Sequence, residues 1–101
     1  MARQVLITGG TGRLGRTLVP RLLDAGHDVR VLTRRRREPA AHRWVVGDLR
    51  TGSGLVAAAA GVDVVIHLAT TNGRGDVAAT GNLIEAVRAA GNPHLDRKSV
   101  V

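Results

Sequence analysis

The chain has 101 residues, with 15 lysines and arginines against 8 acidic residues, a formal net charge of +7, and no cysteine. The length suits one small domain and not two, and the missing cysteine excludes disulfides, thiolate catalysis and cysteine metal sites. One tryptophan and no phenylalanine or tyrosine argue against single-stranded nucleic-acid binding, which depends on aromatic stacking platforms.

Apolar runs and glycine-rich turns alternate along the chain, and their periodicity predicts alternating strands and helices. Gly26 and Gly91 follow the two longer helical segments and are typical helix caps. Pro20 is a mild objection to the first helix, because proline removes one backbone donor. The predicted elements are a strand over 5–7, a helix over 13–25, strands over 29–33 and 44–46, a short helix over 55–60, a strand over 62–69 and a helix over 77–90.

Each of the two longer helices carries apolar residues at helical spacing, which predicts one face packed against a sheet. The continuous apolar run over 62–69 favours a central parallel strand. The predicted inward faces consist of Leu14, Leu18, Leu22 and Ala25 in the first helix and Val77, Leu83, Ile84 and Val87 in the last.

This alternation predicts an α/β fold: a Rossmann-type, doubly wound parallel sheet with right-handed crossovers, truncated after about five strands. We expect residues 1–101 to form an incomplete NAD(P)-binding domain without a substrate domain. The tail reads His94 to Val101, with consecutive charges at Asp96, Arg97 and Lys98. Such charges are costly inside a sheet, so the last strand is either an exposed edge or a degenerate end.

The segment Thr8 to Gly15 contains Gly10-x-Gly12-x-x-Gly15 between a predicted strand and a predicted helix. The first glycine permits a tight turn, the second lets the backbone approach a pyrophosphate, and the third allows close helix packing. The helix N-terminus offers free N–H groups to phosphates. No Gly-Lys-Ser/Thr follows, which excludes a Walker A loop. The alternative is a plain tight turn between strand and helix.

The run Thr-Gly-Gly-Thr-Gly-Arg-Leu-Gly resembles the signature of the extended and atypical short-chain dehydrogenase/reductase superfamily, including its NmrA-like and NAD(P)-dependent epimerase-like members. The spacing Gly9-x-x-Gly12-x-x-Gly15 is that of the extended pattern, and Asp76 resembles the NmrA-like branch. The resemblance covers nearly the whole chain and continues through residues 29–34, 47–49, 65–69 and 82–86.

The residues at the end of the second predicted strand indicate whether the cofactor is NAD(H) or NADP(H). An NAD site places a carboxylate there for the ribose 2′-hydroxyl, whereas this chain has Thr33, Arg34 and Arg35, and Asp28 lies at the wrong end of the strand. Because a guanidinium pairs well with a 2′-phosphate, we expect NADP(H) to be preferred over NAD(H). The alternative is that the arginine run is a solvated loop.

The resemblance implies further cofactor contacts, each with a plainer alternative. Asp48 would accept from the adenine amino group, or it is a turn aspartate. Leu68, Ala69 and Thr70 would line the cofactor ribose, or they are an ordinary strand end. The full predicted cofactor-binding set is Gly9, Thr11, Gly12, Arg13, Leu14, Gly15, Arg34, Arg35, Asp48, Leu49, Leu68, Ala69 and Thr70.

No catalytic residue is predicted in this chain. The family's reducing members need a tyrosine followed by a lysine, but this chain has no tyrosine, and its one lysine, Lys98, lies in the tail. Ser99 resembles a substrate-contacting serine without its partners. His67 is interpreted as a satisfied core histidine rather than a general base. His27, His42 and His94 share no metal-ligand spacing, so no metal site is expected.

The resemblance therefore implies an NADP(H)-binding domain of a short-chain dehydrogenase/reductase-like oxidoreductase or epimerase, not catalytically complete alone and acting on an unidentified small molecule. One alternative is a non-enzymatic NmrA-like redox sensor that acts through a protein partner. A basic nucleic-acid-binding module ranks last, because it leaves the glycine loop unexplained. We expect a cytoplasmic protein without a membrane segment, and self-association through open sheet edges.

Overall fold

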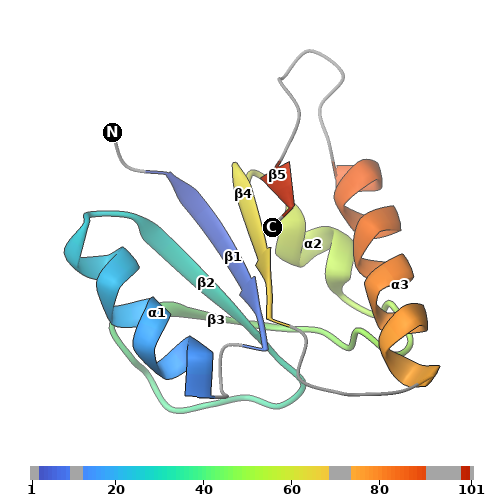
Figure 1. The fold of residues 1–101 in the computed structure, drawn as a ribbon, viewed down its shortest axis with the longest axis horizontal. Helices are drawn as coiled ribbons and strands as arrows, with labels where there is room; N and C mark the ends of the chain where they lie inside the picture. Colours follow the sequence, from blue (N-terminus) through green and yellow to red (C-terminus); the bar gives the residue numbers. More distant parts are fainter. Residues whose placement is uncertain (1–2, 10–12, 69–73, 91–98, 101) are drawn as a thin grey trace.

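The computed structural model describes residues 3–9, 13–68, 74–90 and 99–100. Strands and helices alternate as expected for an α/β chain (Figure 1). The elements are β1 (Gln4–Thr8), α1 (Arg13–Asp24), β2 (Asp28–Thr33), β3 (Arg43–Val46), α2 (Leu55–Ala59), β4 (Val64–His67), α3 (Arg74–Ala90) and β5 (Ser99–Val100).

The five strands form one parallel sheet in the order β3-β2-β1-β4-β5. The chain moves outward from β1 to β2 and β3, then returns to the other side of β1 for β4 and β5. Helix α1 covers one face of the sheet, while α2 and α3 cover the other (Figure 1). This doubly wound arrangement confirms the predicted fold class.

Two aliphatic clusters, one on each face of the sheet, form the core. In β1, Val5 and Ile7 pack on the α1 side, while Leu6 packs on the side of α2 and α3. Successive side chains of a strand point to opposite faces, so a strand covered on both faces needs an uninterrupted apolar run. This requirement explains why β1 and β4 read as continuous aliphatic segments.

The end of α1 follows the prediction. Gly26 has a φ of 87°, a left-handed conformation that favours glycine. The Gly26 N–H donates to the Leu23 carbonyl over 2.9 Å, and the His27 N–H donates to the Leu22 carbonyl over 3.1 Å. These two bonds form a Schellman cap. Pro20 lies within the helix and is exposed, so the fold tolerates it.

Three predicted inward-facing residues point elsewhere. Leu14 is 67% exposed and Ile84 is 38% exposed, and Ala25 is exposed beyond the end of α1. The inner side of α1 instead buries Gly15 and Val19. Leu14 lies next to the buried Gly15 but points away from the packed side of the helix. The prediction of Leu14, Ala25 and Ile84 as core residues is therefore wrong.

Several element bounds also differ from the prediction. The β4 strand spans only Val64–His67, because Val62 is buried in the connection after α2 rather than paired in the sheet. Helix α3 begins at Arg74, three residues before the predicted start at Val77. The last strand is an edge, β5, in which Ser99 pairs with Val64. The charged residues Asp96–Lys98 and the predicted cap Gly91 lie outside the described residues. Within the described part of the chain, no helix is long and apolar enough to span a bilayer.

Candidate functional site

The turn after β1 requires glycine at its first position. Gly9 has a φ of 74°, and a Cβ there would lie 2.1 Å from the Leu68 carbonyl oxygen. The Leu68 N–H donates to the Thr8 carbonyl over 2.9 Å. The ends of β1 and β4 are therefore held together where the strand order reverses, which is the position at which open α/β sheets bind ligands. The remaining loop residues Gly10, Thr11 and Gly12 lie outside the described residues, as do Ala69 and Thr70.

Helix α1 starts beside this turn. Arg13 and Leu14 lie exposed in its first turn, and the buried Gly15 lies on its packed side. A buried glycine at this position lets the helix approach the sheet closely, as the motif predicts. The twelve-residue helix directs its N-terminal N–H groups toward the carboxyl ends of the strands.

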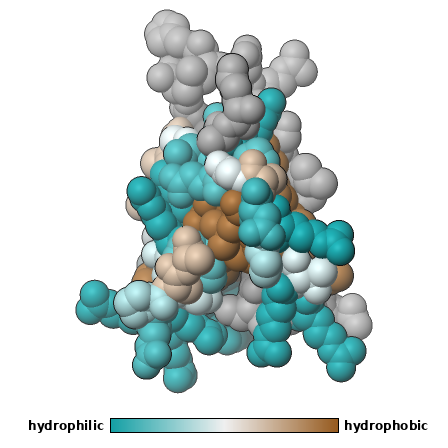
Figure 2. Space-filling view, turned by 90° about the vertical axis from the view of Figure 1, so that its left-hand side faces the viewer, coloured by the Kyte–Doolittle hydropathy of each residue, from teal (hydrophilic) through white to brown (hydrophobic). Residues whose placement is uncertain are grey.

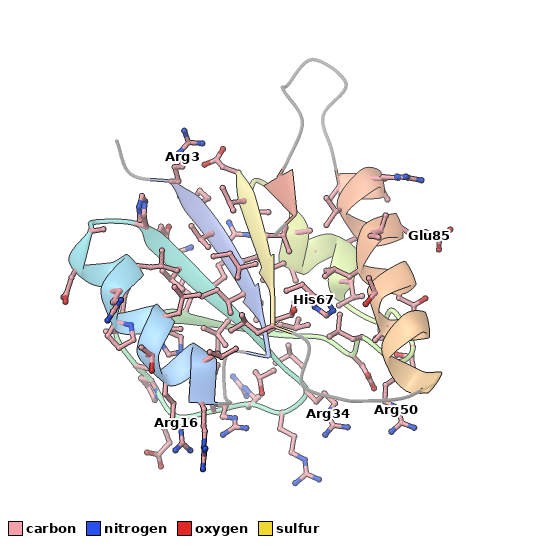
Figure 3. All side chains as sticks on the ribbon, in the orientation of Figure 1. Arg3, Arg16, Arg34, Arg50, His67 and Glu85 are labelled. Carbon is pink, nitrogen blue, oxygen red and sulfur yellow. The ribbon has the colours of Figure 1, made fainter. Side chains whose placement is uncertain are left out.

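The buried Thr33 hydroxyl organises the chain after β2. It donates to the Arg35 carbonyl over 2.9 Å and accepts from the Arg35 N–H over 3.3 Å. Arg37 Nε also donates to it, over 3.4 Å. Arg34 and Arg35 are exposed, and Arg34 extends from the carboxyl end of the sheet (Figure 3). Asp28 is the first residue of β2 and lies at the opposite end of the strand.

The turn between β3 and α2 is held by a network of polar bonds. Asp48 Oδ1 accepts from the Arg50 N–H over 2.8 Å, which makes Asp48 a turn aspartate. Asn82 of α3 donates its amide to the carbonyls of Leu49 over 2.8 Å and Arg50 over 3.1 Å. The half-buried Leu49 packs against the core. The local role of Asp48 is thus established, and its adenine contact stays a prediction.

The ring of His67 joins three elements. Its Nδ1 shares a hydrogen bond with the Thr8 hydroxyl of β1, and its Nε2 lies 3.2 Å from the Thr80 hydroxyl of α3. Both ring nitrogens thus have partners, which confirms that the histidine is satisfied, although its side chain is half-buried and lies outside the two core clusters. Among the residues that the structure describes, no group of three or more metal-ligating side chains comes together.

Thr8, Asn82 and Thr80 support the site, although the sequence pattern assigned none of them a role. Their partners lie 59, 33 and 13 residues away along the chain. No local spacing rule detects contacts across such separations. The common signal is a small polar residue in an otherwise apolar strand end or helix face.

The arginines of the carboxyl edge are not neutralised by nearby acids. Arg16, Arg34 and Arg50 lie along this edge, whereas Arg3 lies at the opposite edge (Figure 3). Within the described ranges, the single ion pair joins Arg43 and Asp28 at 3.9 Å. An edge with these free guanidinium groups, a glycine turn and a helix N-terminus provides several groups that bind phosphates.

Comparison with known proteins agrees with this geometry. Residues 5–95 match the family model described as the NAD dependent epimerase/dehydratase family. An uncharacterized protein of Mycobacterium tuberculosis is 34% identical over 97 residues, which cover 91% of this chain and 11% of that protein. UDP-N-acetylglucosamine 4-epimerase from Bacillus cereus superposes with a TM-score of 0.73 at 28% identity, covering 88% of this chain and 34% of that one.

A variant of uronate dehydrogenase from Agrobacterium tumefaciens, solved in complex with NAD, superposes with a TM-score of 0.71 at 26% identity, over 88% of this chain and 37% of that one. The curated relatives are several times longer: the chain spans 11% of the first of them and 32% of a phenylcoumaran benzylic ether reductase from Pyrus communis. The match over residues 5–95, together with the glycine turn and the doubly wound sheet, shows that this chain belongs to the NAD dependent epimerase/dehydratase family, which binds NAD(P) cofactors.

Proposed function

We propose that this chain binds NADP(H) in preference to NAD(H) at the carboxyl edge of the sheet, as the nucleotide-binding part of an oxidoreductase or epimerase. The observation that carries the preference is the end of β2, where Thr33 is followed by exposed arginines from Arg34 to Arg37. An NAD site needs a carboxylate at this position, whereas a 2′-phosphate needs a cation.

The pyrophosphate would lie over the turn at Gly9 and the first turn of α1. A Cβ at Gly9 would meet the Leu68 carbonyl, so the turn has room only for bare backbone. The N-terminal N–H groups of α1 and the exposed Arg13 supply positive charge for the phosphates. These features fit the dinucleotide that the family binds.

The 2′-phosphate would be held by Arg34, with Arg35 second. The Thr33 hydroxyl bonds the backbone of Arg35 in both directions, so the start of the arginine run is fixed before ligand arrives. A preorganised loop loses less conformational entropy on binding. The adenine would rest beside Asp48 and Leu49, and the nearer ribose beside Leu68, Ala69 and Thr70.

The bound nicotinamide supplies hydride transfer. The residues of this chain bind and orient the cofactor, and no tyrosine among the 101 residues is present to move a proton. The same site would also serve a non-enzymatic NmrA-like sensor, because cofactor binding requires none of the proton-transfer residues. Turnover of a substrate by the whole protein separates the two functions.

Calorimetric titration with NADPH and with NADH tests the proposal. We expect NADPH to bind at least about tenfold more tightly, because the 2′-phosphate adds a charge-assisted pair. Arg34→Ala should remove most of that difference and leave NADH binding unchanged. Arg88→Ala is the matched control, because Arg88 is an exposed arginine in the last turn of α3. Equal affinity for both dinucleotides in a chain with native circular dichroism would refute the preference, and binding of neither would refute the site.

A further inference from the structure

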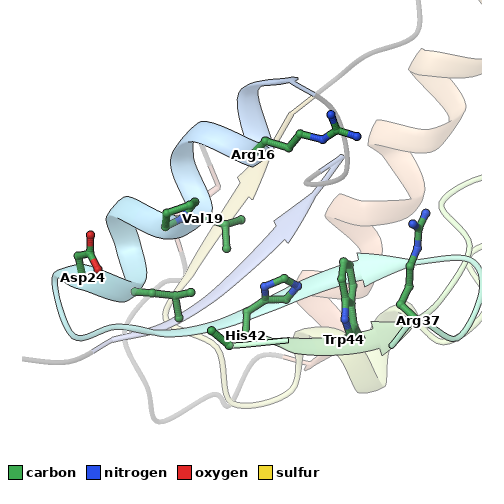
Figure 4. A pocket seen from close by; sticks show the side chains of 10 residues that line it. Arg16, Val19, Asp24, Arg37, His42 and Trp44 are labelled. Atoms are coloured by element: carbon green, nitrogen blue, oxygen red, sulfur yellow. The ribbon is translucent and has the colours of Figure 1, made fainter. Parts of the chain in front are cut away.

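A groove of about 580 Å³ runs between α1 and the edge of the sheet at β3 (Figure 4). It exists because residues 34–42 connect β2 to β3 without a helix, so α1 alone covers this part of the face. From Arg16 to Asp24, α1 advances about 12 Å along its axis. The volume falls within the range of small-molecule sites.

The walls of the groove are apolar and the aromatic wall is fixed. Val19, Pro20 and Leu23 line it from α1, and Trp44 lines it from β3. The Trp44 Nε1–H donates to the Glu38 carbonyl over 2.9 Å. Its ring also meets the His42 ring edge-on, with centroids 4.3 Å apart. Figure 2, which views the molecule from the left-hand side of Figure 1, shows apolar residues at the centre of this side with hydrophilic residues around them.

The two ends of the groove have opposite charge. Arg16 of α1 and Arg37 of the connection after β2 line the groove away from Asp24, which lies at the other end of α1 (Figure 4). Arg37 is held in place, because its Nε donates to the Thr33 hydroxyl over 3.4 Å and its Cζ lies 5.7 Å from the centre of the Trp44 ring. The described residues contain one ion pair, between Arg43 and Asp28, so neither guanidinium of the groove has a carboxylate partner there.

His42 lies between these ends and adds no charge at neutral pH. Burial lowers the pKa of its imidazole from 6.5, which favours the neutral form. Its Nε2 is buried and, within the described part of the chain, has no hydrogen-bond partner. The centre of the groove therefore carries no charge at neutral pH, and the charged side chains that line it lie toward its ends.

We propose that this groove binds a small anionic amphiphile, with a carboxylate between Arg16 and Arg37 and an unbranched apolar body of roughly eight to ten carbons against Trp44 and α1. Two cations at one end and a carboxylate at the other set the orientation of the ligand. The groove lies beside α1 on the face of the sheet, and its Arg16 and Arg37 end adjoins the carboxyl edge proposed for the dinucleotide. Its test uses no dinucleotide, so the two proposals can fail separately.

Trp44 provides the readout, because it is the single tryptophan of a chain without tyrosine or phenylalanine. Titration with decanoate, without any dinucleotide, should produce a saturable change in tryptophan emission. Decanol, which lacks the charge, should bind at least about fivefold more weakly, and decyltrimethylammonium should bind more weakly still. No saturable change, or equal binding of decanoate and decyltrimethylammonium, would overturn the proposal.

Charge-matched variants separate the groove from the general positive charge. Arg16→Gln and Arg37→Gln should each weaken decanoate binding by about fivefold. Arg21→Gln also removes one positive charge, from α1, but Arg21 does not line the groove. The Arg21→Gln variant should therefore bind decanoate with wild-type affinity. Because Arg37 contacts Trp44 and its loss alters the emission baseline, calorimetry replaces fluorescence for that variant. Equal weakening in all three variants would show binding by net charge alone and overturn the site.

Discussion

His42 combines a buried, unpartnered nitrogen with a pKa that burial lowers from 6.5. The unfolded chain therefore binds a proton on this side chain at a higher pH than the folded chain does. Stability should fall as the pH drops below about 6.5, and this loss should level off below the folded pKa. The other charged side chains that line the groove are Arg16, Asp24 and Arg37.

Urea denaturation of the wild type and of His42→Gln between pH 5 and 8 measures this contribution. The difference between the two free energies of unfolding should grow in favour of the variant as the pH falls. The contributions of the other histidines to the free energy of unfolding are common to both proteins and cancel in that difference. A pH-independent difference would show that His42 titrates alike in both states.

Single residues also show where sequence reasoning succeeds. The glycine requirement at Gly9 and Gly26 was predictable, because positive φ and close approach leave no alternative residue. The exposure of Leu14 was not predictable, because apolar residues at helical spacing do not show which side of the helix packs on the sheet; here Gly15 and Val19 define that side. The contacts of Asn82 and Thr80 were equally invisible, since their partners are joined only by the fold.

At the scale of elements, α2 is too short to be stable alone, with five residues from Leu55 to Ala59. Arg30 of β2 reaches its end and donates from Nη1 to the carbonyls of Ala60 over 2.7 Å and Ala58 over 3.3 Å. Arg30→Met should lower the free energy of unfolding by about 1–2 kcal/mol, because these carbonyls lose a charged donor.

Chemical denaturation measures this loss, and Arg43→Met is the control. Arg43 forms an exposed pair with Asp28 at 3.9 Å, so its replacement should change stability by less than about 0.5 kcal/mol. Similar losses in the two variants would contradict a capping role for Arg30. The types and order of the elements were predictable from periodicity. The contact between β2 and α2 was not, because Arg30 occupies a polar position of an alternating strand, which predicts a side chain facing solvent.

At the scale of the whole molecule, β3 and β5 are the outermost strands of the sheet in the part of the chain that the structure describes. Val46 of β3 is 53% exposed, and an exposed apolar edge strand recruits other strands. We expect the chain to self-associate as its concentration rises, and Val46→Lys to shift it toward the monomer. Sedimentation velocity over a concentration series measures this shift.

Val56→Lys is the matched control for the edge variant. Val56 is 47% exposed but lies on helix α2 rather than on the edge strand β3, so the same added charge should leave pairing through β3 unchanged. A monomer at every concentration, or equal effects of both variants, would exclude pairing through β3.

Charge is distributed unevenly between the two edges of the sheet. Asp28 begins β2 and Asp63 precedes β4, where its carboxylate accepts from the Gln4 N–H, whereas Arg16, Arg34 and Arg50 gather at the opposite edge (Figure 3). Arg3 and Arg43 offset the aspartates at the first edge, so the positive charge of the described residues is concentrated at the carboxyl edge. In solution, the field of the molecule turns the carboxyl edge toward an approaching polyanion before the two surfaces touch. The arginines thus raise the rate at which an anionic ligand meets the correct edge, and added salt slows that encounter.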